Sequence, residues 1–378
     1  MSESRLKSLA KQIVNFSIGV EPGDRILIES WESDELAVAV ASEVWQAGGI
    51  PFIARENTAV RRGLIMGLTE VGAEAIGKLA LERIERMQGF ISIRGMSNAF
   101  ELGDVPPDKM ALFNRATQPA KGHRMMRTKW CAMRYPTPGI AQKFHMSTEA
   151  FEDYYYKVML LNYDKMNELS RPLIELVGRT DRVRIVAEDT DISFAVAHFK
   201  MDGPGFINGT GNGRLNLPDG EVGSLPVRES INGHIHYNVP TEYNGIAFDN
   251  VRLSVKDGRI YDAVCGDKRL NAALNEILDT DEGGRGFGEF SLGINPVICA
   301  PVGDILFDEK MWGSLHFTPG APGSAVHWDM VLSQKAEDGG GELWFDDVLI
   351  RKDGIFLTEE LRQLNPERLL PEIEYIGE

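Results

Sequence analysis

The chain has 378 residues, of which 43% are hydrophobic and 25% charged, a composition typical of a globular protein. At about 100–200 residues per domain, this length predicts two domains, each large enough to bury its own core. The net charge of −16 repels phosphate backbones and anionic lipid, so neither nucleic acid nor a membrane surface is an expected partner.

Cysteine usage and hydropathy indicate the compartment. Cys131, Cys265 and Cys299 are isolated and show no CxxC spacing, which argues against a disulfide framework and favours a reducing environment. Residues 2–14 mix charged residues with apolar ones and lack the uninterrupted apolar region of a signal peptide. No run approaches the roughly 18 apolar residues of a transmembrane helix. These features predict a cytoplasmic protein.

The first half of the chain alternates between helix-forming and strand-forming segments. We predict helices at 6–14, 35–46 and 69–86, and short buried strands at 25–29, 50–54 and 89–93. Strands separated by helices of about a dozen residues imply βαβ units on a mostly parallel sheet. A long helical run follows at 147–177, with a predicted break or kink near Pro172. Its tyrosines, residues 154–156, are expected in the core or in subunit packing.

The pattern changes near Gly178 to short strands, tight turns and many glycines. Strands are predicted at 183–187, 251–255 and 348–350, and one helix at 268–278. Turns that need positive φ are expected at 244–245, 256–258 and 352–354. We therefore predict an α/β N-terminal domain with a mostly parallel sheet over residues 1–177. Residues 178–378 are predicted to form a β-rich α+β domain, with the boundary near 172–182.

The chemistry concentrates around His327 and Asp329. Residues i and i+2 of a strand point to the same face, so a strand at 325–332 would place this imidazole and this carboxylate side by side. Trp328 and Met330 would lie on the opposite face. His316 comes eleven residues before His327, next to a loop rich in glycine and proline. Converging imidazoles and carboxylates are what a metal-dependent hydrolase needs.

Two glutamates in glycine-flanked segments are further candidate ligands. Glu221 follows Pro218-Asp219-Gly220, and Glu289 follows Gly286-Phe287-Gly288. A carboxylate in such surroundings is either exposed to solvent or bound to a positive group, because burying a lone carboxylate is costly.

Each of the other polar motifs has two interpretations. His234 and His236 have the spacing of a strand and are either metal ligands or histidines at the surface or at the edge of the core. The basic stretch 121–129, which contains His123, either binds a substrate carboxylate or forms a solvated cationic face. The glycine-rich segment 209–213 resembles a phosphate loop only superficially, because no Lys-Ser/Thr pair follows it.

Six segments, in the same order, resemble the aminopeptidase T/S family of metallopeptidases. They are Tyr135-Pro136-Thr137 with Ala141 and Met146-Ser147-Thr148-Glu149, Thr190-Asp191-Ile192, Asn216-Leu217-Pro218 with Glu221-Val222, Gly288-Glu289 with Leu292-Gly293 and Asn295, Leu306-Phe307-Asp308-Glu309 ahead of His316, and His327 with Asp329.

The resemblance implies a two-metal site in the C-terminal domain. Glu221, Glu289, His316, His327 and Asp329 fall on the family's ligand positions. Glu221 and Glu289 would bridge or flank two ions of Zn, Co or Mn. One of the two glutamates would serve as general base. The family further implies a homodimer that cleaves an amide bond of a short peptide, or of a small molecule, with a metal-activated water.

Two differences from the family pattern support a second hypothesis about the function. The family has a tyrosine several residues after the position of His316, whereas residues 317–323 contain none, and the loop to His327 is short. A related branch, similar to 2,5-dihydroxypyridine dioxygenase, has such a loop and uses one Fe(II) to open a hydroxylated N-heterocycle or aromatic ring. That branch has histidine at the position of Glu289. The five retained ligand types favour hydrolysis, both over oxygenation and over a third reading, a binding protein without catalysis.

Overall fold

The computed structural model describes residues 3–197, 216–243 and 245–374. The chain folds into two compact units. Among the described residues, the first comprises 3–161 with 216–218, and the second comprises 162–197, 219–243 and 245–374. The division falls between Leu161 and Asn162, ahead of the expected boundary at 172–182.

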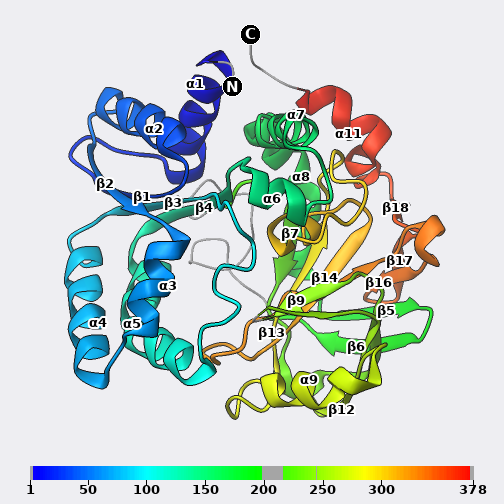
Figure 1. Ribbon diagram of the computed structural model, residues 1–378. Coiled ribbons are helices and arrows are strands. Elements are labelled where there is room, and N and C mark those ends of the chain that lie inside the picture. The colour runs from blue at the N-terminus through cyan, green and yellow to red at the C-terminus, as the bar shows by residue number, and fades with distance from the viewer. Residues whose placement is uncertain (1–2, 198–215, 244, 375–378) are drawn as a thin grey trace. The chain divides into compact units, whose positions relative to one another are not determined.

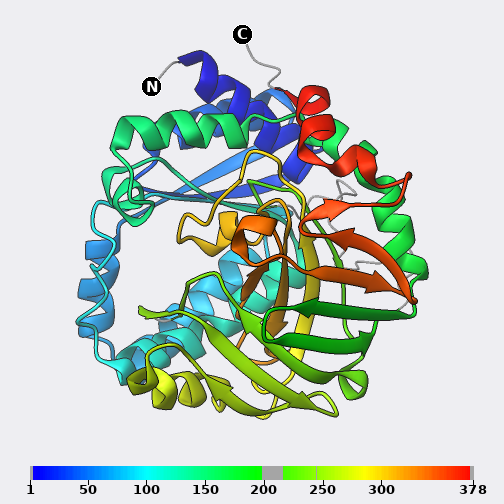
Figure 2. The same cartoon turned by 90° about the vertical axis from the view of Figure 1, so that its right-hand side faces the viewer.

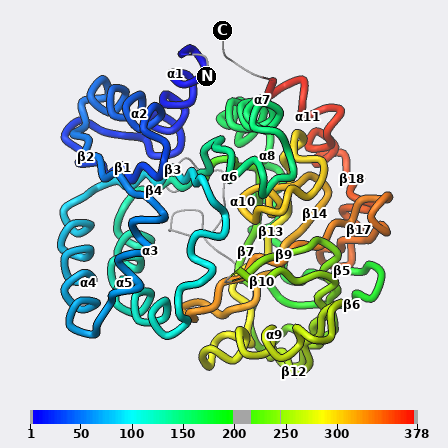
Figure 3. Tube along the Cα trace, in the orientation of Figure 1, coloured from blue at the N-terminus to red at the C-terminus, as the bar shows by residue number. Residues whose placement is uncertain are grey.

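The first unit contains a parallel sheet with helices on both faces (Figures 1 and 3). Its strands, in the order β2-β1-β3-β4, are β1 (Arg25–Trp31), β2 (Ile50–Glu56), β3 (Gly89–Arg94) and β4 (Lys129–Arg134), and every neighbouring pair is parallel. The helices are α1 (Glu3–Lys11), the π-helix η1 (Gln12–Ile18), α2 (Asp34–Gln46), α3 (Thr58–Met66), α4 (Glu70–Ile84), α5 (Pro107–Arg127), α6 (Pro138–Lys143) and α7 (Thr148–Met159). The predicted α/β architecture is confirmed.

The two faces of this sheet bury different side chains. Leu27 and Phe90 pack with Ile84 and Met87 on the side covered by α4 and α5. Ile28 and the residues two positions before and after it on β1 form the opposite face, which is also buried. Burial on both faces explains why β1 and β3 appear in the sequence as continuous apolar runs, whereas β2, at the edge of the sheet, is partly exposed.

The break in the long helical run lies elsewhere than predicted. α7 ends at Met159 and α8 (Tyr163–Arg179) begins after Asn162, whose side chain accepts a hydrogen bond from the backbone N–H of Lys165. A break at Pro172 is not present, because α8 continues through this proline. The C-cap of α7 at Leu160 and the N-cap of α8 at Asn162 separate the two helices instead, while α8 accommodates the single missing N–H donor.

The second unit is rich in antiparallel strands. Its larger sheet has the order β12-β11-β8-β6-β5-β16-β17-β18, and a smaller sheet has the order β15-β14-β13-β7. In Figure 2 the late orange strands lie beside the green strands β5 and β6. The strands are β5 (Arg182–Ala187), β6 (Thr190–Ala195), β7 (Glu221–Ser224), β8 (Asn232–Tyr237), β9 (Thr241–Tyr243), β10 (Ile246–Phe248), β11 (Val251–Lys256), β12 (Arg259–Val264), β13 (Phe287–Gly293), β14 (Ser314–Pro319), β15 (Val331–Ser333), β16 (Glu342–Phe345), β17 (Val348–Lys352) and β18 (Ile355–Phe356).

Helices are few in this unit, as predicted. Besides α8 they are α9 (Asn271–Leu278), α10 (Ile305–Asp308), α11 (Pro366–Ile373) and the 3-10 turns η2 (Arg228–Ser230), η3 (Lys268–Leu270), η4 (Ala336–Asp338) and η5 (Arg362–Leu364). Asp257 and Asp353 both have positive φ, of 48° and 50°, in the turns where it was expected. Of the third predicted turn, Gly245 has φ 80°, and residue 244 lies outside the described residues.

The smaller sheet has one apolar face and one polar face. Phe290 of β13 and Phe317 of β14 both contact Phe194 of the larger sheet, with ring centroids 5.1 and 4.6 Å apart. Because side chains alternate along a strand, residues 289 and 291 of β13 and 316 and 318 of β14 face away from that aromatic core. The packing of the two sheets thus directs these polar side chains to the opposite face of the smaller sheet.

Candidate metal centre

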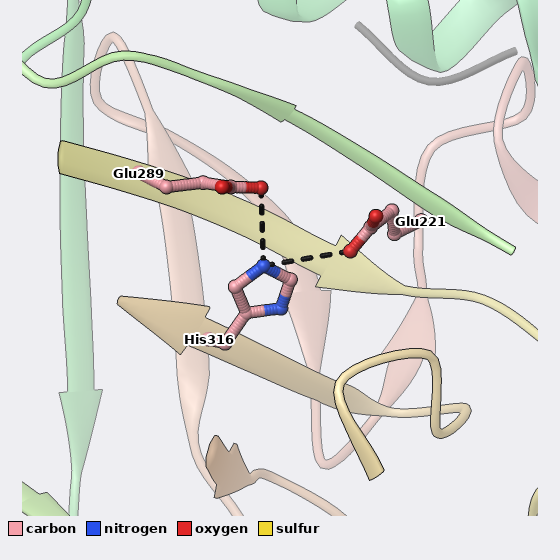
Figure 4. Close-up of side chains that lie close together, drawn as sticks. All are labelled: Glu221, Glu289 and His316. Atoms are coloured by element: carbon pink, nitrogen blue, oxygen red, sulfur yellow. Dashed lines mark hydrogen bonds and ion pairs between the residues drawn. The ribbon is translucent and has the colours of Figure 1, made fainter. Parts of the chain in front are cut away.

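Three strands of the smaller sheet bring Glu221, Glu289 and His316 together. The register pairs Ser291 of β13 with His316 of β14, and Gly293 of β13 with Glu221 of β7. Glu289 lies two residues before Ser291 and shares its face. All three side chains therefore point into the same volume, as Figure 4 shows.

The imidazole of His316 is the centre of this group. Its Nε2 lies 3.3 Å from Oε1 of Glu289 and 3.4 Å from Oε2 of Glu221. All three residues are buried. Nδ1 of His316 is also buried and has no hydrogen-bond partner within the part of the chain that the structure describes. Nε2 is thus the ring nitrogen directed at the two carboxylates (Figure 4).

His327 and Asp329 lie in an extended segment ahead of β15. The predicted strand at 325–332 is wrong in extent, because only residues 331–333 form a strand. The preceding residues contact β14 through isolated backbone hydrogen bonds, such as that from the N–H of Trp328 to the carbonyl of Pro319, at 3.1 Å. The expected alternation is nevertheless present, since Trp328 and Met330 are buried while the side chains of His327 and Asp329 are 55% and 16% exposed.

Glu289 joins these two residues to the first group. Nε2 of His327 lies 3.2 Å from Oδ1 of Asp329 and 3.8 Å from Oε2 of Glu289. Candidate ligand atoms of Glu289, His327 and Asp329 all lie within 4.8 Å of one another, as do those of Glu221, Glu289 and His316. Glu289 therefore turns one oxygen toward each imidazole, as a carboxylate that bridges two ions would.

The electrostatics of this cluster favour a bound cation. Burial alone would lower the pKa of His316, but Glu289 and Glu221 raise it to about 9. Asp329 does most to raise the pKa of His327, to about 10. Against the opposing effect of burial, the imidazoles lower the pKa values of Glu289 and Asp329. Imidazole nitrogens and carboxylate oxygens are ligands that Zn, Co and Mn accept, so the residues present fit a divalent ion.

Two hydroxyls hold the carboxylates in place. Ser291 donates to Oε1 of Glu289 at 3.1 Å, and Thr318 donates to Oδ1 of Asp329 at 2.7 Å. The sequence analysis assigned neither a role, although each follows a candidate ligand by two residues, Ser291 after Glu289 and Thr318 after His316. Groups that orient metal ligands in this way tune the affinity of a site.

A buried lysine, also missed, contacts Glu221. Nζ of Lys310 lies 2.9 Å from Oε1 of Glu221 and forms a second ion pair with Glu309. Burial would lower the pKa of Lys310, but the two glutamates raise it above its ordinary value. Burial raises the pKa of Glu309 to about 8. The charged residues after Phe307 could have suggested this role, but their depth is set by the fold.

Asn295 and Gly223 help to hold β7 and the residues before it in place. The side-chain amide of Asn295 donates to the carbonyl of Asp219 at 2.8 Å, two residues before Glu221. A Cβ at Gly223 would lie 1.8 Å from Oγ of Ser291, so only glycine lets β7 approach β13 this closely. The segments around Glu221 and Glu289 are thus braced against each other.

Tyr243 of β9 also reaches the segment that contains the ligands. Its ring contacts that of Trp328, with centroids 4.7 Å apart. Burial raises the pKa of its hydroxyl, and the nearby backbone N–H of His327 opposes the rise. A tyrosine absent from residues 317–323 is therefore present at this site from another strand.

The remaining candidates lie apart from the two ligand groups. His236 is buried on β8, where Nε2 contacts Oδ1 of Asn250 at 3.2 Å, and His234 is exposed. Neither belongs to a group of potential ligands among the described residues. His123 lies on α5 of the first unit. The glycine-rich segment 209–213 lies outside the described residues.

No helix among the described residues combines the length and the apolar composition needed to cross a membrane.

Comparison with known proteins places this site in a family. A family model described as thermophilic metalloprotease (M29) matches residues 2–325. Aminopeptidase 2 of Geobacillus stearothermophilus is 23% identical over 322 residues, which cover 77% of this chain and 76% of that protein. Aminopeptidase AmpS of Bacillus subtilis (strain 168) is 31% identical over 108 residues, 28% of this chain and 26% of that protein.

Solved structures show the same fold. Wild-type AmpT from Thermus thermophilus has a TM-score of 0.75 at 18% identity, covering 94% of this chain and 99% of its own. A 2,5-dihydroxypyridine dioxygenase from Pseudomonas putida KT2440 is more distant, with a TM-score of 0.58 at 13% identity, covering 96% and 100%. The match of the family model over most of the chain decides between these neighbours: the chain belongs to the M29 family of thermophilic metalloproteases and is a metal-dependent hydrolase.

Proposed function

We propose that the chain is an aminopeptidase that removes N-terminal residues from short peptides, using two divalent ions of Zn, Co or Mn. Glu221, Glu289 and His316 would hold one ion, and Glu289, His327 and Asp329 the other. The family and the names of the relatives support the reaction class. A homodimer and a cytoplasmic location belong to the same proposal, and the free cysteines 131, 265 and 299 support the location.

The position of Glu289 between the two imidazoles carries the proposal of two ions. Its Oε1 lies 3.3 Å from Nε2 of His316, and its Oε2 lies 3.8 Å from Nε2 of His327. One carboxylate with its two oxygens directed at two separate ligand groups suits a pair of ions roughly 3.5–4 Å apart. Oε1 of Glu221 contacts Lys310, so Glu221 offers mainly Oε2 to an ion.

Divalent ions at such a site act as Lewis acids and lower the pKa of a coordinated water toward about 7. The protein must then take up the proton that this water releases. One of Glu221 and Glu289 would fill this role, and Oε1 of Glu221, which accepts from Lys310, is the oxygen that the proposed two-ion arrangement leaves uncoordinated. The exposure of His327 leaves this side of the site open to a substrate.

The dioxygenase reading is weaker. The fold similarity to the dioxygenase supports it, but a mononuclear Fe(II) centre of that type uses two histidines and one carboxylate. The group around His327 contains one histidine and two carboxylates. The ligand set therefore favours hydrolysis.

Metal counting combined with substrate tests separates these readings. Wild-type protein purified without added metal is expected to contain about two Zn, Co or Mn ions per chain and to cleave aminoacyl-p-nitroanilides or short peptides. Glu289→Ala should lose both ions and His327→Ala one of them. His234→Ala, a substitution at an exposed histidine away from both groups, is the control and should keep the wild-type metal content.

The contrary results are equally specific. One Fe(II) per chain, with oxygen consumption on dihydroxypyridines, would replace the proposal by the dioxygenase reading. Wild-type metal content in both Glu289→Ala and His327→Ala would reject the assigned ligands and favour a protein that binds without catalysis.

A further inference from the structure

Arginines gather on one face of the parallel sheet in the first unit, and two of them lie at the carboxyl ends of its strands. β3 ends at Arg94 and β4 ends at Arg134, and these two residues are register partners. On its other side Arg94 is the register partner of Trp31, the last residue of β1. The order β2-β1-β3-β4 puts the topological switch point between β1 and β3. Open α/β sheets bind ligands beyond such a point, at the carboxyl ends of the strands.

Two helices that pack on the same face of the sheet add further cations. The guanidinium of Arg61, on α3, lies over the ring of Trp31 at 4.0 Å. The guanidinium of Arg124, on α5, lies over the ring of Phe90 at 4.9 Å, near the amino end of β3. The side chain of Arg94, on the same face, turns back along the strand to Ser92 and is close enough for the charge of Arg124 to act on it. The strand ends and the helices therefore contribute to a single cluster, which we call the arginine cluster (Arg61, Arg94, Arg124 and Arg134).

Carboxylates compensate only part of this charge. Arg61 pairs with Glu56 at 3.3 Å. Glu29 pairs with Arg83, outside the cluster, at 3.3 Å, and its charge also attracts Arg94 and Arg124 without an ion pair to either. Within residues 3–197, 216–243 and 245–374, Arg94 has no ion pair, and its Nε donates to Oγ of Ser92 at 3.0 Å.

Arg124 is likewise without an ion pair in the described part of the chain. Its Nε is buried and has no hydrogen-bond partner there, and its terminal nitrogen contacts only the sulfur of Met125, at 3.8 Å. Two guanidinium groups thus have donors that no carboxylate of the described protein satisfies. Leaving a buried charged donor unsatisfied is costly.

The pKa values of the basic side chains in and beside the cluster are lowered accordingly. Burial, followed by the charges of Arg134 and Arg124, lowers the pKa of Arg94 to about 10. Burial also lowers the pKa of Arg124, and it lowers that of Lys121, where Arg124 adds to the effect. Like charges held this close are destabilising unless an anion lies among them.

We propose that the arginine cluster is a binding site for an oxyanion, a carboxylate or phosphate group, with Arg94 and Arg124 as the direct donors. The planar guanidinium presents paired N–H groups that match the spacing of carboxylate and phosphate oxygens. Arg61 and Arg134 flank these donors and add to the positive field. The site belongs to the first unit and does not depend on the proposed peptidase reaction.

Thermal unfolding and calorimetry of the full-length chain test this site. The wild type is titrated with inorganic phosphate, with acetate and with chloride at equal ionic strength, before and after chelation of metal. Its melting temperature should rise with phosphate or acetate and not with chloride, in both metal states. A response to only one of the two oxyanions identifies the chemistry of the group that is bound.

Three variants make the test specific. Arg94→Met should melt above the wild type without anion, because a buried uncompensated charge is gone, and should bind the oxyanion about tenfold or more weakly. Arg124→Met should behave alike and serves if Arg94→Met fails to fold. Arg127→Met removes an exposed arginine of the same helix and should respond like the wild type.

Three results would overturn the proposal. The first is an unchanged anion response in both Arg94→Met and Arg124→Met. The second is a lower melting temperature of both variants in the absence of anion, which would make these arginines structural. The third is a response that disappears on chelation, which would assign the anion to the metal centre.

Discussion

The ammonium of Lys310 lies 2.9 Å from Oε1 of Glu221, and both side chains are almost fully buried. This ion pair connects the metal centre to the interior of the second unit, since Lys310 also pairs with Glu309. Breaking a buried pair by removing one partner costs about 3–5 kcal/mol, because the other charge is left uncompensated.

Lys310→Met is therefore expected to lower the free energy of unfolding by several kcal/mol, measured by chemical denaturation of the metal-free protein. Lys352→Met removes a lysine that pairs with Glu342 at 3.0 Å on the surface and serves as the matched control. Because that pair is exposed, the control should unfold like the wild type. Equal stability of the two variants would mean that burial of Lys310 has no energetic consequence.

Tyr243 is expected to support the candidate metal ligands through its hydroxyl, which lies near the backbone of His327. Tyr243→Phe keeps the ring against Trp328 but removes the hydroxyl whose pKa the backbone N–H of His327 lowers. Loss of an orienting group of this kind lowers metal affinity by about tenfold or more. Competition with a chromophoric chelator measures the change. Tyr261→Phe, at an exposed tyrosine of the same unit, should retain the wild-type affinity, and equal affinities in both variants would remove the role assigned to Tyr243.

The imidazoles predict a pH dependence with a definite sign. In the metal-free protein the pKa of His316 is raised from 6.5 to about 9 and that of His327 to about 10. Protons bound more tightly in the folded state stabilise it, so this contribution is fully present below pH 6.5 and is lost as the pH rises through about 9 to 10. Bound metal requires neutral imidazoles and competes with these protons.

The melting temperature of metal-free protein should therefore fall between pH 6.5 and about 9, while the increase caused by added metal should grow over the same interval. Differential scanning fluorimetry with and without chelator measures both. The double variant His316→Gln/His327→Gln should lose both trends. A stabilisation by metal that stays constant across this interval would contradict the linkage.

Gly223 is expected to resist substitution because β7 and β13 approach closely there. A Cβ in Gly223→Ala would lie 1.8 Å from Oγ of Ser291 and 2.3 Å from the carbonyl oxygen of Phe290. Overpacking of this kind costs about 1–3 kcal/mol or more, and displacing Ser291 also removes the donor to Glu289. The free energy of unfolding, measured by denaturation, and the metal content should both decline.

Gly63→Ala is the matched control for this substitution. Nothing lies within 4 Å of a Cβ at this position of α3, so alanine should stabilise the helix, by up to about 1 kcal/mol. A Gly223→Ala protein as stable as the wild type would show that the two strands separate at little cost.

Much of the fold follows from local patterns in the sequence. The apolar runs at 25–29, 50–54 and 89–93 predicted strands of a mostly parallel sheet, and β1, β2 and β3 contain them. The Asp-Gly turns at 257–258 and 353–354 predicted positive φ, which the structure confirms. Periodicity failed at 147–177, because two amphipathic helices joined by a short turn have the same spacing of apolar residues as one continuous helix.

The candidate metal centre was likewise predicted only in part from the sequence. The spacing of His327 and Asp329 alone placed their side chains together, since alternation is a property of any extended backbone. That Glu289 lies between two imidazoles could not be read from the sequence, because it depends on the pairing of β13 with both β7 and β14. The roles of Lys310 and Tyr243 were also missed, since no periodic pattern connects them to the ligands.

The sequence by itself therefore determined the two-part organisation of helices and strands, the ligand types of the site and their resemblance to a metallopeptidase family. Only the tertiary structure decided that Glu289 is shared between two groups, that Lys310 is buried against Glu221 and that Arg94 and Arg134 lie side by side at the ends of their strands. Local periodicity specifies which face of an element is apolar. Strand register and the packing of sheets bring residues about a hundred positions apart into contact, and these depend on the burial of the whole core.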